Sequence, residues 1–223
     1  MNAPSLAERL ALTVITDPSC GDGRSLVEVV RAALQGGAPA IQMRVKNGSG
    51  REMMELGALL LAETTRAGAL LFVNDRVDVA LALGADGAHI GADDLPLPAA
   101  RKISPPGFLL GRSVDSAAEA RQAELDGADY VGLGPVLATP SKGDAGKPIG
   151  LAGVREGTRG LGIPTVVIGG IDARNTAAVV EAGADGVAVI RAVLQAVDPA
   201  AAARELIREV VAGREARPQG TSI

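Results

Sequence analysis

The sequence has very few aromatic side chains, one cysteine and one histidine. Two Phe, one Tyr and no Trp occur in 223 residues. Proteins that bind single-stranded nucleic acid stack bases on aromatic side chains, so this composition argues against that class. Cys20 has no second cysteine for an internal disulfide, and His89 has no second histidine for a multi-histidine metal site.

Excess positive charge and long apolar segments are also missing. The formal net charge is −4 at pH 7, which argues against a nucleic-acid partner. Mean hydropathy is +0.23, yet no 18-residue stretch avoids charges or Gly-rich breaks, so we expect no membrane-spanning helix and no membrane partner. Glu8 and Arg9 precede the first apolar run, and no small-residue cleavage site follows. We therefore expect no secretory signal and a cytoplasmic location.

Hydrophobic residues instead form eight short runs that alternate with amphipathic stretches. The runs are rich in Val, Ile and Leu and lack a two-residue alternation, which is typical of parallel strands covered on both faces. We expect strands at residues 12–16, 40–45, 70–73, 87–90, 108–114, 129–133, 165–168 and 186–190. Gly-Ala-Asp or Gly-Ala-Pro precedes every second run, and Gly readily ends a helix.

This alternation predicts an α/β fold, a (β/α)8 TIM barrel that forms a single domain over residues 1–223. An open, doubly wound sheet is the alternative, but no G-x-G-x-x-G sequence follows the first run. The tail from about residue 213 is polar, and we expect it to be frayed.

In such a barrel the active site lies at the C-terminal ends of the strands. Asp75, Asp93 and Asp94 follow the third and fourth expected strands, and Asn74 precedes the first of them. Two carboxylates beside a neutral amide suit Mg²⁺, which keeps water ligands and often bridges a substrate phosphate. A general acid–base pair and helix capping are the alternatives.

Carboxylates at the opposite rim have a different expected role. Three of them precede strands, where a structural role in a turn is expected, and these are Asp86, Asp129 and Asp185. His89 lies inside an apolar run, so we interpret it as a hydrogen-bonded packing residue.

Cations and glycines at the active-site rim point to phosphate. Gln42, Arg44 and Lys46 alternate at the end of the second run and should face the same side, where they bind an anion or form an internal salt bridge. Gly169-Gly170, followed by a helix start, and the turn at Ile190-Arg191 come after the seventh and eighth runs, where barrels often bind phosphate. The long loop 135–148 has the composition of a binding loop or lid, with Thr139, Ser141 and Lys142.

Taken in order, these motifs resemble the thiamine-phosphate synthase family from about residue 12 to residue 211. The matching segments are Gln42-x-Arg44-x-Lys46, Phe72-Val73-Asn74-Asp75, Gly87-Ala88-His89-Ile90-Gly91 with Asp94, Tyr130-Val131-Gly132-Leu133-Gly134-Pro135, Thr139-x-Ser141-Lys142, Ile168-Gly169-Gly170-Ile171 and Gly183-Ala184-Asp185-Gly186-Val187. The last two recur in other phosphate-binding barrels.

The resemblance implies a transferase of thiamine biosynthesis. It would join 4-amino-2-methyl-5-hydroxymethylpyrimidine diphosphate to 4-methyl-5-(2-hydroxyethyl)thiazole phosphate, giving thiamine phosphate and diphosphate. Mg²⁺ would be held by Asp75 and Asp94. The groups implied to bind the pyrimidine diphosphate are Arg44, Lys46, Asn74, Ser113 and Lys142, with Gln42 on the pyrimidine side. Those implied to bind the thiazole phosphate are Thr139, Ser141, Gly170 and the amides near Ile190 and Arg191.

The scarcity of catalytic side chains agrees with this chemistry. The thiazole nitrogen already has a lone pair, so the reaction needs no general base. The difficult step is the dissociative departure of diphosphate, which Mg²⁺, Lys142, Arg44 and Lys46 would stabilise by charge, with Ser113 as a further catalytic group. Because Phe72, Phe108 and Tyr130 all lie in expected strands, we expect aliphatic and polar groups to hold the pyrimidine ring.

Some positions depart from the family pattern and leave alternatives open. Ser141 replaces the usual Thr, Asp115 stands where His is common, and Arg191 replaces a usual Ser. Related thiazole tautomerases share the fold but depend on a His at the position of Asp115. A barrel that binds a phosphorylated ligand without catalysis is the other alternative. The sequence leaves the oligomeric state open, a homo-oligomer included.

Overall fold

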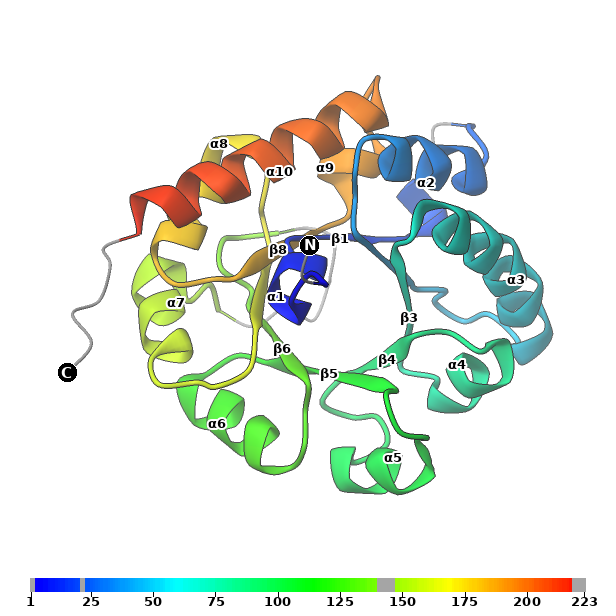
Figure 1. Ribbon diagram of the computed structural model, residues 1–223, viewed down its shortest axis with the longest axis horizontal. Coiled ribbons are helices and arrows are strands. Elements are labelled where there is room, and N and C mark those ends of the chain that lie inside the picture. The colour runs from blue at the N-terminus through cyan, green and yellow to red at the C-terminus, as the bar shows by residue number, and fades with distance from the viewer. Residues whose placement is uncertain (1–2, 21–22, 140–146, 218–223) are drawn as a thin grey trace.

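The computed structural model describes residues 3–20, 23–139 and 147–217. Eight parallel strands pair in chain order and close into a barrel, which Figure 1 shows along its axis. The strands are β1 (Leu12–Ile15), β2 (Ala40–Met43), β3 (Leu70–Asn74), β4 (Gly87–Ile90), β5 (Leu109–Val114), β6 (Tyr130–Leu133), β7 (Thr165–Ile168) and β8 (Gly186–Val189). The predicted TIM barrel is confirmed, and every predicted strand is present to within two residues at each end.

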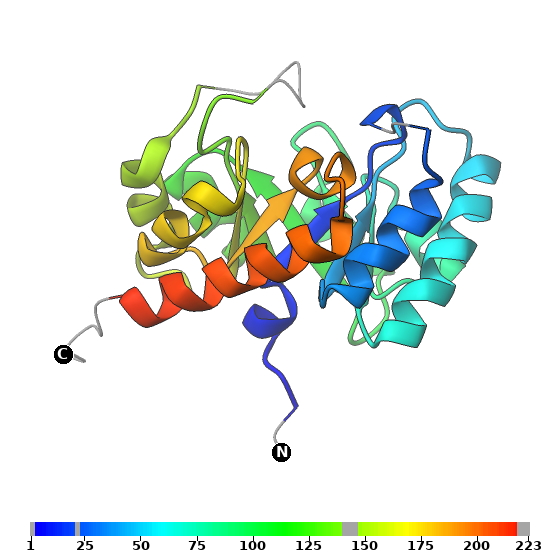
Figure 2. The same cartoon turned by 90° about the horizontal axis from the view of Figure 1, so that it is seen from above.

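Helices surround the barrel, except the first, which lies below it (Figures 1 and 2). They are α1 (Leu6–Arg9), the 3-10 turn η1 (Pro18–Cys20), α2 (Leu26–Gln35), α3 (Gly50–Ala67), α4 (Val77–Leu83), α5 (Leu97–Ile103), α6 (Ala117–Leu125), α7 (Gly150–Thr158), α8 (Ala173–Glu181), α9 (Arg191–Leu194) and α10 (Pro199–Ala216). Among the described residues, no helix is long and apolar enough to cross a membrane.

Two aromatic side chains pack with aliphatic ones in the barrel interior. The rings of Phe72 and Tyr130 meet edge to face, with centroids 5.3 Å apart. A Cβ at Gly111 would lie 2.2 Å from the Tyr130 ring, so glycine leaves the space that the ring needs. Phe108 lies one residue before β5, and the expectation that all three aromatic residues lie within strands is wrong for this residue.

The C-terminal helix α10 packs against α8 and α2. Gly213 is buried in this contact, where a Cβ would lie 2.5 Å from the Ala177 carbonyl oxygen. The guanidinium of Arg214 donates to the carbonyl oxygens of Asp185 and Ala7. The predicted fraying from residue 213 is therefore wrong as far as residue 217, because these contacts hold the helix end; residues 218–223 lie outside the described part.

The three aspartates that precede strands have the predicted structural role. Each accepts a hydrogen bond from a backbone N–H of the strand before it in the chain, at 2.7–2.8 Å, and the pairs are Asp86 with Leu71, Asp129 with Leu110 and Asp185 with Thr165. They fasten neighbouring strands at the end where the strands begin.

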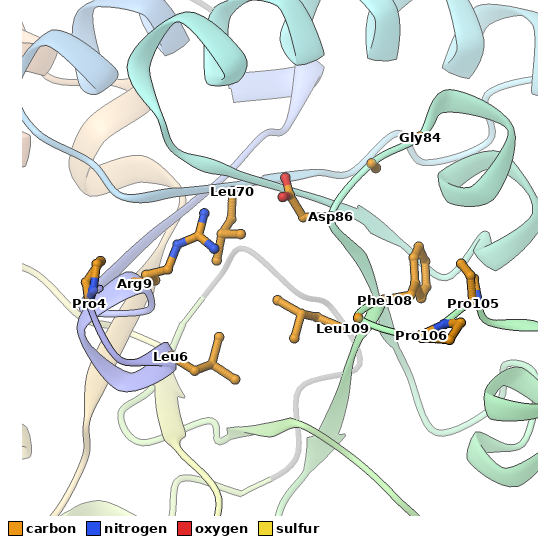
Figure 3. A pocket seen from close by; sticks show the side chains of 12 residues that line it. Pro4, Leu6, Arg9, Leu70, Gly84, Asp86, Pro105, Pro106, Phe108 and Leu109 are labelled. Atoms are coloured by element: carbon orange, nitrogen blue, oxygen red, sulfur yellow. The ribbon is translucent and has the colours of Figure 1, made fainter. Parts of the chain in front are cut away.

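A cavity of about 490 Å³ opens at this same end of the barrel. Figure 2 shows α1 below the barrel, and Figure 3 shows Leu6 and Arg9 of this helix beside the cavity with Asp86 and Leu109. These residues lie at the N-terminal ends of the strands. In barrels of this kind that end contributes to stability, whereas chemistry takes place at the other.

Candidate active site

A larger cavity, of about 1150 Å³, opens at the C-terminal ends of the strands. All predicted site residues in the described part of the chain line it, and these are Gln42, Arg44, Lys46, Asn74, Asp75, Asp94, Ser113, Thr139, Gly170, Ile190 and Arg191. Ser141 and Lys142 lie outside the described residues. The structure therefore brings together residues that lie up to 149 positions apart in the sequence (191 − 42), from β2 to the start of α9.

The amide side chains of β2 and β3 form one polar patch on the cavity wall. Gln42 is 5% exposed, and its Nε2 donates to Asn74 Oδ1 at 2.6 Å. The bond orients both amides, and each retains a second polar group for other contacts. A ligand with hydrogen-bonding edges can therefore be recognised here without an aromatic platform.

Arg44 lies just beyond the end of β2 and is held by its backbone. Its N–H donates to Thr16 Oγ1 at 2.9 Å, and the Thr16 hydroxyl donates to its carbonyl at 3.3 Å. Its Nη1 lies 3.6 Å from Asp17 Oδ2, so the internal ion pair considered as an alternative is present, but it is loose. Lys46 is exposed at the rim.

Two polar atoms in the described residues are buried without a hydrogen-bond partner, Arg44 Nη1 and Thr13 Oγ1. Both residues line the cavity. Buried polar groups are nearly always satisfied in folded proteins, and an exception often marks the place of a ligand. A guanidinium nitrogen can only donate, so an acceptor oxygen in the cavity, such as that of an anionic ligand, would satisfy it.

Asp17 forms an ion pair with the cavity-lining Arg44, and the sequence reasoning missed it. Burial raises its pKa, but hydrogen bonds from Ser19 and the charge of Arg44 outweigh that effect and hold the pKa below its ordinary value. Ser19 donates to Asp17 Oδ1 from its backbone N–H at 2.9 Å and from its hydroxyl. The rule that selected Asp75, a carboxylate directly after a strand, would also have selected Asp17.

Asp75 and Asp94 face one another over Gly91. Asp75 has a left-handed backbone with φ of 65°, and its N–H donates to the His89 carbonyl at 2.8 Å. Asp94 Oδ2 accepts from the Gly91 N–H at 2.8 Å. A Cβ at Gly91 would lie 2.7 Å from Asp94 Oδ2 and 3.7 Å from Asp75 Oδ1, so both carboxylates converge on this glycine.

The convergence has an electrostatic consequence. Burial, together with the hydrogen bond and negative charge of Asp94, raises the pKa of Asp75 to about 6. Two carboxylates in this position repel each other, and a divalent cation between them would relieve the repulsion. Across the described ranges, no three His, Cys, Asp or Glu side chains gather as metal ligands. Two carboxylates alone are compatible with Mg²⁺, which takes one or two carboxylates and completes its shell with water and substrate oxygens.

His89, Ser113 and Tyr130 form a hydrogen-bonded chain across three strands. His89 is 8% exposed, with Nδ1 3.0 Å from the Tyr130 hydroxyl and Nε2 3.0 Å from Ser113 Oγ. The interpretation of His89 as a hydrogen-bonded packing residue is confirmed. Its imidazole also supports Ser113, which faces the cavity.

The rim after β7 is shaped by two glycines in the left-handed region. Gly169 has φ of 101° and Gly170 has φ of 66°. A Cβ at Gly169 would lie 2.7 Å from Pro135 Cα, and one at Gly170 would lie 2.9 Å from the Ala138 carbonyl oxygen. The chain after β6 therefore passes directly over this backbone, and only glycine fits.

The neighbouring helix starts differ in how they could receive an anion. At α8, Asp172 accepts from the Arg174 N–H at 2.9 Å and pairs with the Arg174 guanidinium. The start of α8 thus already has a carboxylate cap, and the phosphate site expected after β7 stays a prediction. In the described chain α9 begins at the exposed Arg191, and its N-cap residue Ile190 provides no side-chain hydrogen bond.

Comparisons with known proteins place the chain in a family. The family model described as thiamine monophosphate synthase matches residues 12–193. A thiamine-phosphate synthase from Moorella thermoacetica is 56% identical over 200 residues, which are 90% of this chain and 95% of that protein. One from Methanoculleus marisnigri is 51% identical over 203 residues, 91% of this chain and 96% of that protein.

A solved structure has the same fold at high sequence identity. The thiamine phosphate pyrophosphorylase from Pyrococcus furiosus matches with a TM-score of 0.87 and 46% identity, covering 94% of this chain and 100% of that chain. Together with the family match over most of the sequence, these similarities show that the chain belongs to the thiamine-phosphate synthase family of transferases.

Proposed function

We propose that this protein joins 4-amino-2-methyl-5-hydroxymethylpyrimidine diphosphate to 4-methyl-5-(2-hydroxyethyl)thiazole phosphate in a Mg²⁺-dependent reaction. The observation that supports this most directly is the buried Arg44 Nη1, which makes no hydrogen bond and only a 3.6 Å ion pair with Asp17, in the same cavity as the converging carboxylates Asp75 and Asp94. A diphosphate bridging a cationic group and a metal fits both features. The substrates are small and phosphorylated, in keeping with a cytoplasmic enzyme.

The bond changes need no proton transfer at carbon. The C–O bond between the pyrimidine methylene and the diphosphate breaks, and its electron pair leaves with the diphosphate. The thiazole nitrogen then donates its lone pair to the methylene carbon. Mg²⁺ held by Asp75 and Asp94 would supply positive charge to the leaving group.

The chain's own cations supply the rest of that charge. Arg44 is positioned by Thr16, and its guanidinium would donate to diphosphate oxygens. Lys46 at the rim, and Lys142 outside the described residues, would add two ammonium groups. Each such contact strengthens as charge develops on the leaving group, and removing one typically reduces the rate by about a hundredfold.

The hydrogen-bonded chain below the cavity sets the direction of the Ser113 hydroxyl. Complete burial raises the pKa of Tyr130 far above its ordinary value, so the phenol keeps its proton. If that proton is donated to His89 Nδ1, then Nε2 bears the other proton and donates to Ser113 Oγ. The Ser113 O–H is then directed to a ligand, where it would donate to the diphosphate.

The opposite side of the cavity would hold the thiazole phosphate. Thr139, Gly170 and the start of α9 at Ile190 and Arg191 line that side. The backbone N–H groups there, the Thr139 hydroxyl and the Arg191 guanidinium are all donors to phosphate oxygens. Ser141, outside the described residues, would add a second hydroxyl.

One assay tests the proposal. Purified protein with Mg²⁺ and both substrates should release diphosphate and form thiamine phosphate in equal amounts, and EDTA should stop the reaction until Mg²⁺ is restored. Absence of product with both substrates saturating would refute the proposed reaction. A thiazole tautomerase would instead convert its thiazole carboxylate phosphate without the pyrimidine substrate, so that reaction is the control.

A further inference from the structure

The loop after β4 is held from outside the barrel by an arginine that does not line the cavity. Arg112 lies on β5 in register with Ile90 of β4, and it alternates with the cavity-facing Ser113. Its Nη1 donates to the carbonyl oxygen of Gly91, and its Nη2 lies 3.4 Å from that of Ala92. In the described part of the chain, no carboxylate forms an ion pair with Arg112.

The same glycine is bonded to Asp94 on its other side. The Gly91 N–H donates to Asp94 Oδ2 at 2.8 Å, and the Asp94 N–H lies 3.4 Å from the Gly91 carbonyl oxygen. Gly91 is thus contacted by the Arg112 guanidinium at its carbonyl and by the Asp94 carboxylate at its N–H. Movement of this residue would move the carboxylate.

Asp94 needs such support because it faces a second negative charge. Asp75 and Asp94 converge over Gly91, and two ionised carboxylates so placed repel each other. Asp75 is fixed by the bond from its N–H to the His89 carbonyl, at the end of β3. The loop that bears Asp94 is therefore the part that would yield, and Arg112 restrains it.

We propose that Arg112 is a positioning residue that keeps Asp94 beside Asp75 and so prepares the carboxylate pair for a divalent cation. The inference rests on the proposed function for its metal. Arg112 acts through the Gly91 and Ala92 carbonyls and touches neither metal nor substrate. Residues that orient metal ligands in this way typically change metal affinity by about 10- to 100-fold when they are replaced.

The test compares three variants of the full-length protein. Arg112→Met removes the donors and keeps most of the apolar stem, whereas Arg112→Lys keeps a cation and one donor group. Arg121→Met is the matched control, because Arg121 is exposed on α6. Circular dichroism establishes that each variant is folded, and the Lys variant serves if the Met variant is not.

Metal affinity is measured with Mn²⁺ by electron paramagnetic resonance, in the presence of inorganic diphosphate. We expect a dissociation constant about tenfold higher for Arg112→Met, a smaller increase for Arg112→Lys and none for Arg121→Met. In the assay, the Mg²⁺ concentration for half-maximal rate should rise in parallel, with kcat at saturating Mg²⁺ within about twofold of the parent. Unchanged affinity in both Arg112 variants would overturn the inference.

Hydrogen exchange separates this inference from the proposed function. The Gly91 amide should exchange at least about tenfold faster in metal-free Arg112→Met than in the parent, whereas Arg121→Met should leave it unchanged. If the parent binds no Mn²⁺, the proposed metal site fails, and the exchange rate still decides whether Arg112 holds the loop. Equal exchange in Arg112→Met and parent would refute the restraint itself.

Discussion

Replacing Tyr130 by Phe removes one oxygen atom from the barrel interior and tests the hydrogen-bonded chain to Ser113. The Tyr130 side chain is 2% exposed, and its hydroxyl lies 3.0 Å from His89 Nδ1. A buried hydrogen bond contributes about 1 kcal/mol net, and an acceptor that loses its donor adds a further penalty, so we expect a loss of about 1–2 kcal/mol in the free energy of unfolding. For a chain of this size the Tm should fall by about 3–6 °C.

The effect on turnover follows from the tautomer of His89. Without the phenol, the imidazole proton can occupy Nδ1, and Nε2 then accepts from the Ser113 hydroxyl, which turns it away from the ligand. Ser113→Ala removes a donor to developing charge and should lower kcat by about a hundredfold. Tyr130→Phe only permits the unfavourable tautomer of His89, so it should lower kcat less, by about tenfold.

The decisive measurement is the double variant. Because Tyr130 acts through Ser113, the loss in Tyr130→Phe/Ser113→Ala should equal that in Ser113→Ala alone, within about threefold, in kcat from steady-state diphosphate release. Both single variants and the double variant are compared at a temperature well below their unfolding transitions. A double loss equal to the product of the single losses would refute the proposed chain, since independent groups multiply their effects.

Three further predictions concern the carboxylates and the glycine backbone. Asp75→Asn and Asp94→Asn should each weaken Mn²⁺ binding at least tenfold and lower turnover about a hundredfold; full turnover in both would exclude the pair as metal ligands. Gly170 has φ of 66°, and a Cβ there would lie 2.9 Å from a carbonyl oxygen, so Gly170→Ala should lower the free energy of unfolding by about 1–3 kcal/mol. The KM for the thiazole phosphate should increase more than the KM for the pyrimidine substrate. Unchanged unfolding in urea would contradict this prediction. Hydrogen bonds from Arg31 and Arg66 lower the pKa of Glu63 from 4.5 to about 2, so its contribution to stability should be complete above pH 4.5 and disappear as the pH falls towards 2. Glu63→Gln should therefore make the free energy of unfolding less dependent on pH between 4.5 and 2. An unchanged pH dependence would refute the assignment.

Much of the barrel could be predicted because its strands are short, apolar and bounded by glycine turns. Gly183 and Asp185 before β8 illustrate this, since one ends a helix and the other binds the Thr165 N–H. The end of α10 was not predicted. Gly213 looks like a helix breaker in sequence, but its missing Cβ lets α10 approach α8, and Arg217 then donates to the carbonyl oxygen of Val180 at 2.9 Å.

The candidate site was predictable where function depends on position along one strand. Asp75 and Asp94 were found because each follows a strand, and Arg44 because it alternates with Gln42. Contacts that depend on the register between strands could not be read from the sequence. Arg112 reaches Gly91 only because β5 lies beside β4 in a particular register.

The shortage of aromatic side chains affects how the cavity can hold a pyrimidine ring. Tyr130 lines the cavity floor, yet it is almost completely buried and is engaged through its hydroxyl with His89, so it offers a ligand little ring surface. The other lining residues are charged, polar, glycine or aliphatic, such as Ile168, and none of them has a benzene or indole ring. A pyrimidine ring would therefore gain little stacking energy here. Under the proposed function, Arg44 and the converging carboxylates would instead bind a diphosphate and its metal, so affinity should reside in the same groups that would stabilise the departing charge.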